Sequence, residues 1–130
     1  MSMKRVALAA LIVAAAVTGT MAQGAPPYVG RWAVEGPDAC RDGVNDDLKV
    51  NFTAKQLDYY ASTCRVVSSR RLAKSGDNAH RLKLACEGEG VKTSREVILI
   101  VLEKTEQRPE LLMHVDAVDW ATLVYQRCSD

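Results

Sequence analysis

The stretch 59-YYASTCRVVSSRRLAKSGDNAHRLKLACE-87 decides the fold, because two β-type runs flank a polar turn centred near residues 75–76. We expect the runs to pair as an antiparallel hairpin in which the paired residue numbers sum to 150. Side chains alternate between the faces of a strand, so the cysteines of this hairpin share one face and predict a cross-strand disulfide. The predicted pairs are Cys64–Cys86, Val66–Leu84 and Ser68–Leu82.

Similar runs continue on both sides of the hairpin, separated by turn residues such as Gly36-Pro37-Asp38 and Gly88-Glu89-Gly90. Residues 53–60 could form a helical turn instead, and residues 94–107 contain helix formers, but the β-branched run at 97–101 favours a strand there. Seven strands at this spacing predict an all-β antiparallel meander or barrel of about seven to eight strands. The predicted strands are Tyr28–Glu35, Leu48–Thr53, Tyr59–Arg71, Ala79–Glu87, Arg95–Glu103, Glu110–Val115 and Ala121–Cys128.

The first 22 residues have the pattern of a secretory signal peptide. Lys4 and Arg5 precede an apolar run over 6–17, which is shorter than the roughly 20 residues that span a bilayer. Residues 20–22 fit a cleavage site, so we expect one exported domain, residues 23–130, in the periplasm or outside the cell, with no integral membrane segment after cleavage. Loss of Lys4 and Arg5 changes the formal net charge from +1 to −1, which argues against nucleic-acid binding.

The four cysteines contain no C-x-x-C pair, which argues against a zinc ribbon or a redox motif. In an oxidising compartment they predict two disulfides. The hairpin register favours Cys64–Cys86, which leaves Cys40–Cys128 to tie the end of the first strand to the end of the chain. The alternative pairing, Cys40–Cys64 with Cys86–Cys128, stays open at this point.

Catalytic motifs are missing from the sequence. His80 and His114 are not at metal-binding spacing, and there is no G-x-S-x-G, P-loop or G-x-G-x-x-G sequence. We therefore expect a non-enzymatic protein and predict no catalytic, cofactor-binding or metal-binding residues.

Three segments are candidates for contact with a partner. The leader, residues 23–27, is expected to be flexible, and the outward face of the hairpin is basic. The strand over 95–103 is apolar on both faces. Its outward side is either Val97, Leu99 and Val101 or Ile98, Ile100 and Leu102. The basic face could instead be an ordinary solvated surface. The outward side of the apolar strand could instead be covered by a loop, or it could pair with a second copy in a homodimer. The candidate contacts are Gln23, Gly24, Ala25, Pro26 and Pro27; Arg65, Arg71, Arg81 and Lys83; and Val97, Leu99 and Val101.

Gly30-x-Trp32 together with the late Arg127 resembles the lipocalin-type barrels, which implies that the Arg packs over the Trp and shuts one barrel end. Gly30-x-Trp32 followed by Cys40 and Cys64 is similar to the bacterial metalloprotease inhibitors, small exported barrels whose N-terminal segment enters a protease. Four cysteines and the lack of a Trp directly after Cys64 depart from that family. The pattern Gly-x-Trp, Cys40, Cys64, then residues 86–90 (CEGEG) and residues 127–128 (RC) resembles small exported alphaproteobacterial proteins of unassigned role, and implies a fold but no activity.

Together these features predict an exported binding protein that contacts another protein, with inhibition of a hydrolase as its specific form. The alternatives are a small-ligand carrier with a lipocalin-like barrel, and an envelope structural protein with no small ligand.

Overall fold

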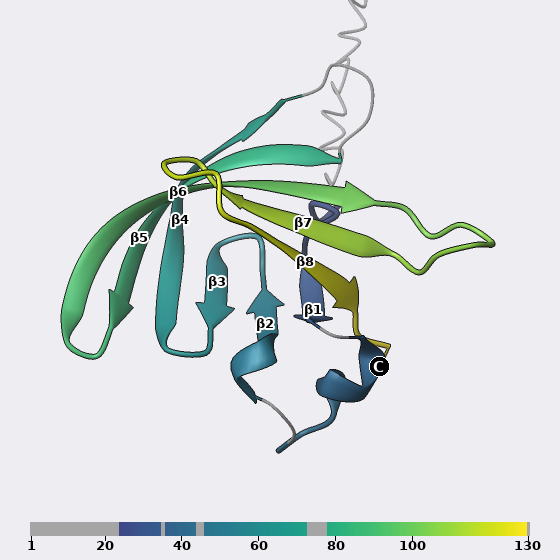
Figure 1. Cartoon of the computed structure of the whole chain (residues 1–130). Helices are drawn as coiled ribbons and strands as arrows, with labels where there is room; N and C mark the ends of the chain where they lie inside the picture. Colours follow the sequence, from purple (N-terminus) through teal and green to yellow (C-terminus); the bar gives the residue numbers. More distant parts are fainter. Residues whose placement is uncertain (1–23, 35, 44–45, 73–77, 130) are drawn as a thin grey trace, which may run out of the picture.

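The computed structural model describes residues 24–34, 36–43, 46–72 and 78–129, and these form an eight-stranded closed antiparallel barrel (Figure 1). The predicted all-β barrel is therefore confirmed. The predicted signal peptide, Gln23 and the centre of the hairpin turn lie outside the described residues. The strands are β1 (Gly30–Ala33), β2 (Lys49–Phe52), β3 (Gln56–Tyr59), β4 (Ser62–Arg71), β5 (Ala79–Gly88), β6 (Val91–Leu102), β7 (Leu111–Asp116) and β8 (Thr122–Arg127), with short 3₁₀ turns η1 (Pro37–Cys40) and η2 (Asp46–Leu48) between β1 and β2.

Each strand pairs with the next along the chain, and β8 pairs with β1 to close the barrel. The expected strand over 59–71 begins later, as β4 at Ser62, because the chain turns at Tyr60 and Ala61; Tyr59 instead ends β3, a strand that was not predicted. The turn before β3 is fixed by Thr53, whose Oγ1 accepts hydrogen bonds from the backbone N–H groups of Lys55 and Gln56. Residues 56–59 are thus strand rather than a helical turn, and the barrel has an even number of strands.

The register of the β4–β5 hairpin is as expected near its disulfide and shifts farther along. Cys64 pairs with Cys86 and Val66 with Leu84, but a β-bulge at Val67 then offsets the two strands. A bulge places two residues opposite one, so Ser69 rather than Ser68 faces Leu82. The residue numbers of each pair sum to 151 beyond the bulge, and every side chain of β4 there points to the face opposite to the one predicted.

The barrel interior is filled by apolar side chains from every strand, including Trp32, Phe52, Leu57 and Leu112. Tyr28, which precedes β1, is buried at one barrel end and packs edge-to-face on His80. Side chains alternate along a strand, so the residues between these core positions point to the outside of the barrel.

Both predicted disulfides, Cys64–Cys86 and Cys40–Cys128, are present, and the alternative pairing is excluded. Cys64–Cys86 joins β4 to β5, and Cys40–Cys128 ties η1 to the end of the chain. Disulfides of this kind are typical of proteins outside the cytosol. In the described part of the chain, no helix has the length and apolarity needed to cross a membrane.

Candidate functional site

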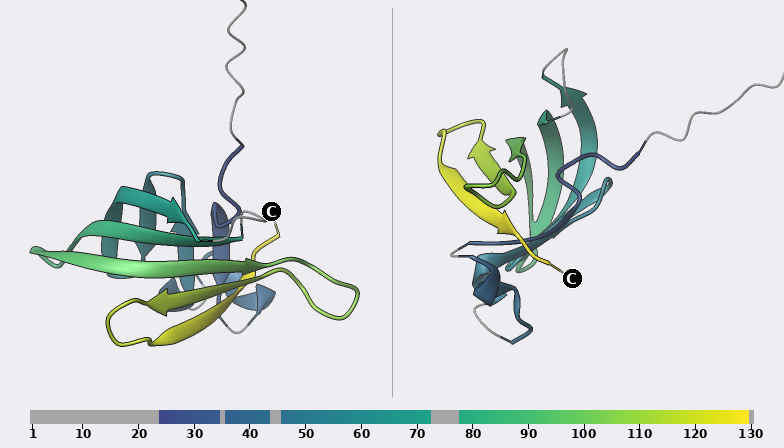
Figure 2. Two further views of the ribbon diagram at one scale, coloured as in Figure 1. Left: turned by 90° about the horizontal axis from the view of Figure 1, so that it is seen from above. Right: turned by 90° about the vertical axis from the view of Figure 1, so that its right-hand side faces the viewer.

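The strands β4, β5 and β6 are longer than the others and form a curved sheet that extends past the rest of the barrel (Figure 2). Residues 91–96 of β6 pair with β5 only, whereas residues 97–100 pair with both β5 and β7. Leu82, Leu84 and Cys86 of β5 are buried in the core, so the residues between them point outward. We call the outward side of this sheet the basic face; its basic side chains are Arg65, Arg70, Arg81, Lys83 and Lys92.

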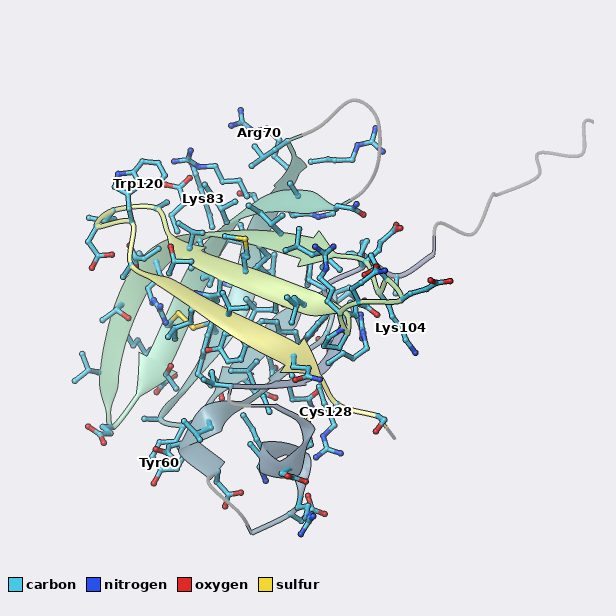
Figure 3. The ribbon with its side chains drawn as sticks, turned by 45° about the vertical axis from the view of Figure 1, so that its right-hand side comes forward. Tyr60, Arg70, Lys83, Lys104, Trp120 and Cys128 are labelled. Atoms are coloured by element: carbon cyan, nitrogen blue, oxygen red, sulfur yellow. A yellow bond between two sulfur atoms is a disulfide. The ribbon has the colours of Figure 1, made fainter. Side chains whose placement is uncertain are left out.

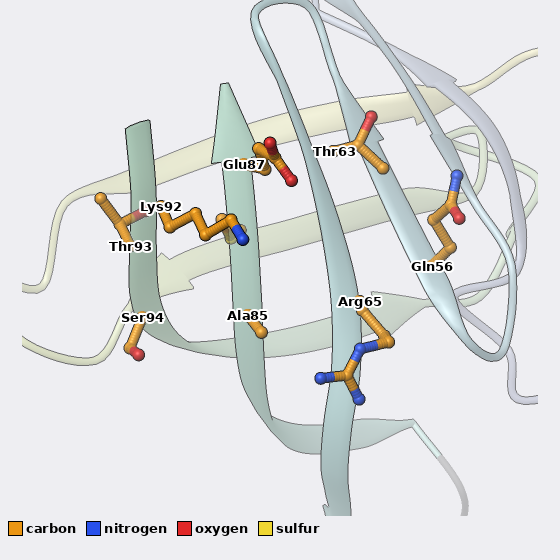
Figure 4. A pocket seen from close by; sticks show the side chains of 9 residues that line it. Gln56, Thr63, Arg65, Ala85, Glu87, Lys92, Thr93 and Ser94 are labelled. Carbon is orange, nitrogen blue, oxygen red and sulfur yellow. The ribbon is translucent and has the colours of Figure 1, made fainter. Parts of the chain in front are cut away.

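The basic face is hollowed, and charged side chains line its two larger hollows. The first, of about 580 Å³, is lined by Gln56, Arg65, Glu87 and Lys92 among others, and Figure 4 shows these side chains on neighbouring strands. The second, of about 510 Å³, is lined by Ser68, Arg70, Arg81, Lys83 and Glu96. Surfaces of this kind attract an acidic partner, because the guanidinium and ammonium groups donate hydrogen bonds to carboxylates.

One acidic side chain balances part of this charge. Arg81 Nε lies 2.6 Å from Glu96 Oε1 across the β5–β6 pair. The hydrogen bond from Arg81 lowers the pKa of Glu96, so this carboxylate stays ionised at neutral pH. In the described part of the chain, Arg81 forms an ion pair, and the other four basic side chains of this face form none. Its five basic side chains outnumber the carboxylates of Glu87 and Glu96, so the face keeps a net positive charge.

Arg71 does not lie with the other basic residues, contrary to the prediction. The bulge at Val67 turns it to the face of its partner His80, where both line a hollow of about 570 Å³ at the barrel end beside the leader residues Gly24 to Pro27. Arg65, Arg81 and Lys83 do share the outward face as expected.

The leader is partly fixed to the barrel rather than flexible throughout. The carbonyl oxygen of Pro26 accepts a hydrogen bond from the N–H of Val29 at 3.0 Å, and that of Pro27 accepts one from Arg127 Nη2 at 2.8 Å. Gly24 and Ala25 are exposed.

Val97, Leu99 and Val101 are core residues with 0–3% exposure, so their predicted role as partner contacts is wrong. Leu112 of β7 and Leu82 of β5 are inward-facing too, which fixes this face of β6 in the interior. The outward apolar residues of β6–β8 are Ile98, Ile100, Leu102, Leu111, Met113, Val115 and Val124. If two copies of the chain pair through β6, these outward residues form the contact between them.

Sequence reasoning missed a polar cluster inside the barrel. The Tyr59 hydroxyl lies 2.7 Å from His114 Nε2, and the Arg95 guanidinium lies 5.0 Å from the centre of the Tyr59 ring. Burial lowers the pKa of His114 to about 4 and raises that of Tyr59 far above its usual value, so both are neutral at pH 7. The cluster joins β3, β6 and β7, and no spacing in the sequence links these residues.

The turn between β7 and β8 was also missed. Val118 is 82% exposed and Trp120 is 65% exposed, and Trp120 has a positive φ of 61°. Exposed large apolar side chains grouped on one turn are a feature of interaction surfaces.

Comparison with known proteins gives no further guide to the site, since no family model matches the sequence and no curated protein or solved structure is detectably similar to it.

Proposed function

We propose that this chain is an exported, non-enzymatic binding protein that recognises an acidic protein through its basic face. The observation that carries the proposal is the placement of Arg65, Arg70, Arg81, Lys83 and Lys92 around hollows on one outer face, against the two acidic side chains Glu87 and Glu96. Clustered charge of one sign accelerates encounter with a partner of the other sign and selects against like-charged surfaces.

An outer site is favoured over an interior one by the packing of the barrel. Tyr28, Trp32 and Leu57 are buried along its interior, and the Cys64–Cys86 disulfide belongs to the same core. Barrels of about eight strands are often filled by their own side chains. This supports a surface-binding protein over the alternative of a small-ligand carrier.

The test compares two double charge reversals of equal net charge. Arg65→Glu with Lys83→Glu reverses two charges of the basic face, whereas Lys104→Glu with Arg108→Glu reverses two exposed charges in the β6–β7 loop. Each oxidised protein is immobilised and exposed to envelope and secreted proteins at low and moderate salt. We expect a retained acidic protein with the wild type and the control, and its loss with the basic-face variant. Equal retention by all three proteins would contradict the proposed site.

The leader supports a second candidate function, inhibition of a secreted hydrolase. Arg127 fixes Pro27 to the barrel while Gly24 and Ala25 remain exposed, so a short segment is presented from a rigid support. Pre-organised segments lose less conformational freedom when they bind. If this is the function, removal of residues 23–25 abolishes inhibition of a secreted metalloprotease and leaves the fold intact. Unchanged inhibition after the truncation, or none with the intact chain, would remove this candidate.

A further inference from the structure

The β7–β8 turn, residues 116–121, is held in one conformation by its own acidic side chains. Asp116 Oδ1 accepts hydrogen bonds from the N–H groups of Val118 at 2.8 Å and Asp119 at 3.3 Å, and Asp119 Oδ1 accepts one from Ala121 at 2.9 Å. The N–H of Trp120 donates to the carbonyl oxygen of Asp116 at 3.0 Å. These bonds fix the backbone that carries Val118 and Trp120.

This turn has two features that are unfavourable in themselves, although its hydrogen bonds hold its backbone in place. Trp120 has a φ of 61°, a conformation that bulky residues rarely adopt. Its side chain and that of Val118 are mostly exposed, although burial of such side chains would be favourable. Strained and exposed apolar residues that persist in a well-ordered turn point to a role at a binding surface.

The turn lies beside the basic face. The N–H of Ala117 donates to the carbonyl oxygen of Glu96 at 2.9 Å, which ties the turn to β6. Val118 lines a hollow of about 410 Å³ together with Val67, Lys83 and Glu96. Figure 3 shows Trp120 on the same side of the molecule as Lys83 and Arg70.

From this arrangement we infer that Trp120 and Val118 are the apolar anchor of the interface that the basic face forms. The inference rests on the proposed function and specifies the partner further: an acidic protein segment that also carries an apolar or aromatic side chain. Interfaces commonly combine Trp and Arg hot spots at a desolvated centre. Charge attracts the partner, and the anchor discriminates between acidic partners with and without an apolar group.

Two synthetic polypeptides separate the contributions of charge and anchor. Poly-glutamate offers carboxylates alone, and a random glutamate–tyrosine copolymer adds aromatic groups. The binding of each polymer to the full, oxidised protein is measured at one fixed ionic strength. The proteins are the wild type, Trp120→Ala, Val118→Ala and the Arg65→Glu, Lys83→Glu double variant. Tyr60→Ala is the matched control, because Tyr60 is a 70% exposed aromatic residue on the β3–β4 turn, away from Trp120 in Figure 3.

We expect the wild type to bind the copolymer at least tenfold more tightly than poly-glutamate, and Trp120→Ala to lose this difference while its binding to poly-glutamate is unchanged. Tyr60→Ala should behave as wild type. The emission of Trp120, excited beyond the tyrosine absorption band, should shift to the blue when the copolymer binds. The only other tryptophan is the buried Trp32. The Trp120→Phe variant therefore reports the emission of Trp32 alone and serves as the reference.

The possible failures are distinguishable. If the wild type binds both polymers equally, or if Trp120→Ala retains the preference for the copolymer, the anchor is wrong and the proposed basic-face function stands. If neither polymer binds, or if the charge-reversal variant binds them as well as the wild type, the proposed function is wrong. The inferred role of Trp120 and Val118 is then wrong as well.

Discussion

The guanidinium of Arg127 lies 4.1 Å from the centre of the Trp32 ring and covers it at one end of the barrel. The same group donates hydrogen bonds to the carbonyl oxygens of Val29 and Pro27 and forms an ion pair with Glu110. Gly30 has a φ of 142°, and a Cβ there would collide with this guanidinium. The Gly-x-Trp sequence and the late Arg therefore form one structural unit that closes the barrel, as the resemblance to lipocalin-type barrels implies.

Arg127→Ala should destabilise the protein by about 3 kcal/mol, because it removes the stacking on Trp32 and leaves two half-buried carbonyl groups without their donor. Arg127→Lys should be intermediate, since an ammonium group cannot reproduce the planar fork. The free energy of unfolding in urea measures both. Arg41→Ala, which breaks the exposed pair with Asp38, is the control and should change stability by less than about 0.5 kcal/mol. Equal effects at the two positions would refute the closure role.

The two disulfides should contribute unequally to stability. They close loops with sequence separations of 88 and 22 residues. Chain-entropy estimates give about 4.5 kcal/mol for Cys40–Cys128 and about 3.4 kcal/mol for Cys64–Cys86. Paired replacement of Cys40 and Cys128 by Ser should therefore lower the free energy of unfolding more. Replacement of Cys64 and Cys86 by Ala is the appropriate comparison, because these two sulfurs lie in the apolar core. A larger loss for the shorter loop would show that core packing dominates.

Alternation and turn residues are local signals, so the sequence predicted the all-β barrel and favoured the observed disulfide pairing, which the structure then settled. Cys64 and Cys86 lie before the bulge, so a simple register placed them correctly. Arg71 lies after it and was misplaced, since nothing in the run of valines and serines indicates where the extra residue falls.

The apolar strand shows a second limit of sequence reasoning. Both faces of residues 97–102 are apolar, so alternation alone cannot say which face is inward. That choice depends on the pairing of β6 with both β5 and β7. The polar cluster around His114 and the tie between the β7–β8 turn and Glu96 likewise depend on contacts between distant strands.

Replacement by alanine should destabilise the protein much more on the buried face of β6 than on its outward face. Leu99→Ala should cost about 2–5 kcal/mol of stability, because the residue is fully buried and its loss leaves a cavity. Ile100→Ala, one residue along and on the outer side, should cost less than half as much. Urea unfolding followed by the emission of Trp32 and Trp120 measures both. Similar losses at the two positions would contradict the assignment of the faces.

His114 should make the protein less stable in mild acid. Burial holds its pKa at about 4 in the folded state, against the ordinary value of 6.5, so the unfolded chain binds a proton more readily. Stability from this group is fully present above pH 6.5 and is lost as the pH falls toward 4, by up to about 3 kcal/mol. The groups that face it are Tyr59, Arg95, Asp116 and Tyr125.

The comparison with His114→Gln isolates this effect. Glutamine does not titrate and can still hydrogen-bond the Tyr59 hydroxyl, so the variant should lose stability at neutral pH but show a flatter profile between pH 6.5 and 4. His80 is present in both proteins and cancels in the difference. The pKa of Asp116 is lowered, chiefly by the hydrogen bond from the N–H of Val118, so its contribution is lost only at still lower pH. Parallel urea-unfolding profiles for the two proteins across this range would show that His114 is not held neutral by the barrel.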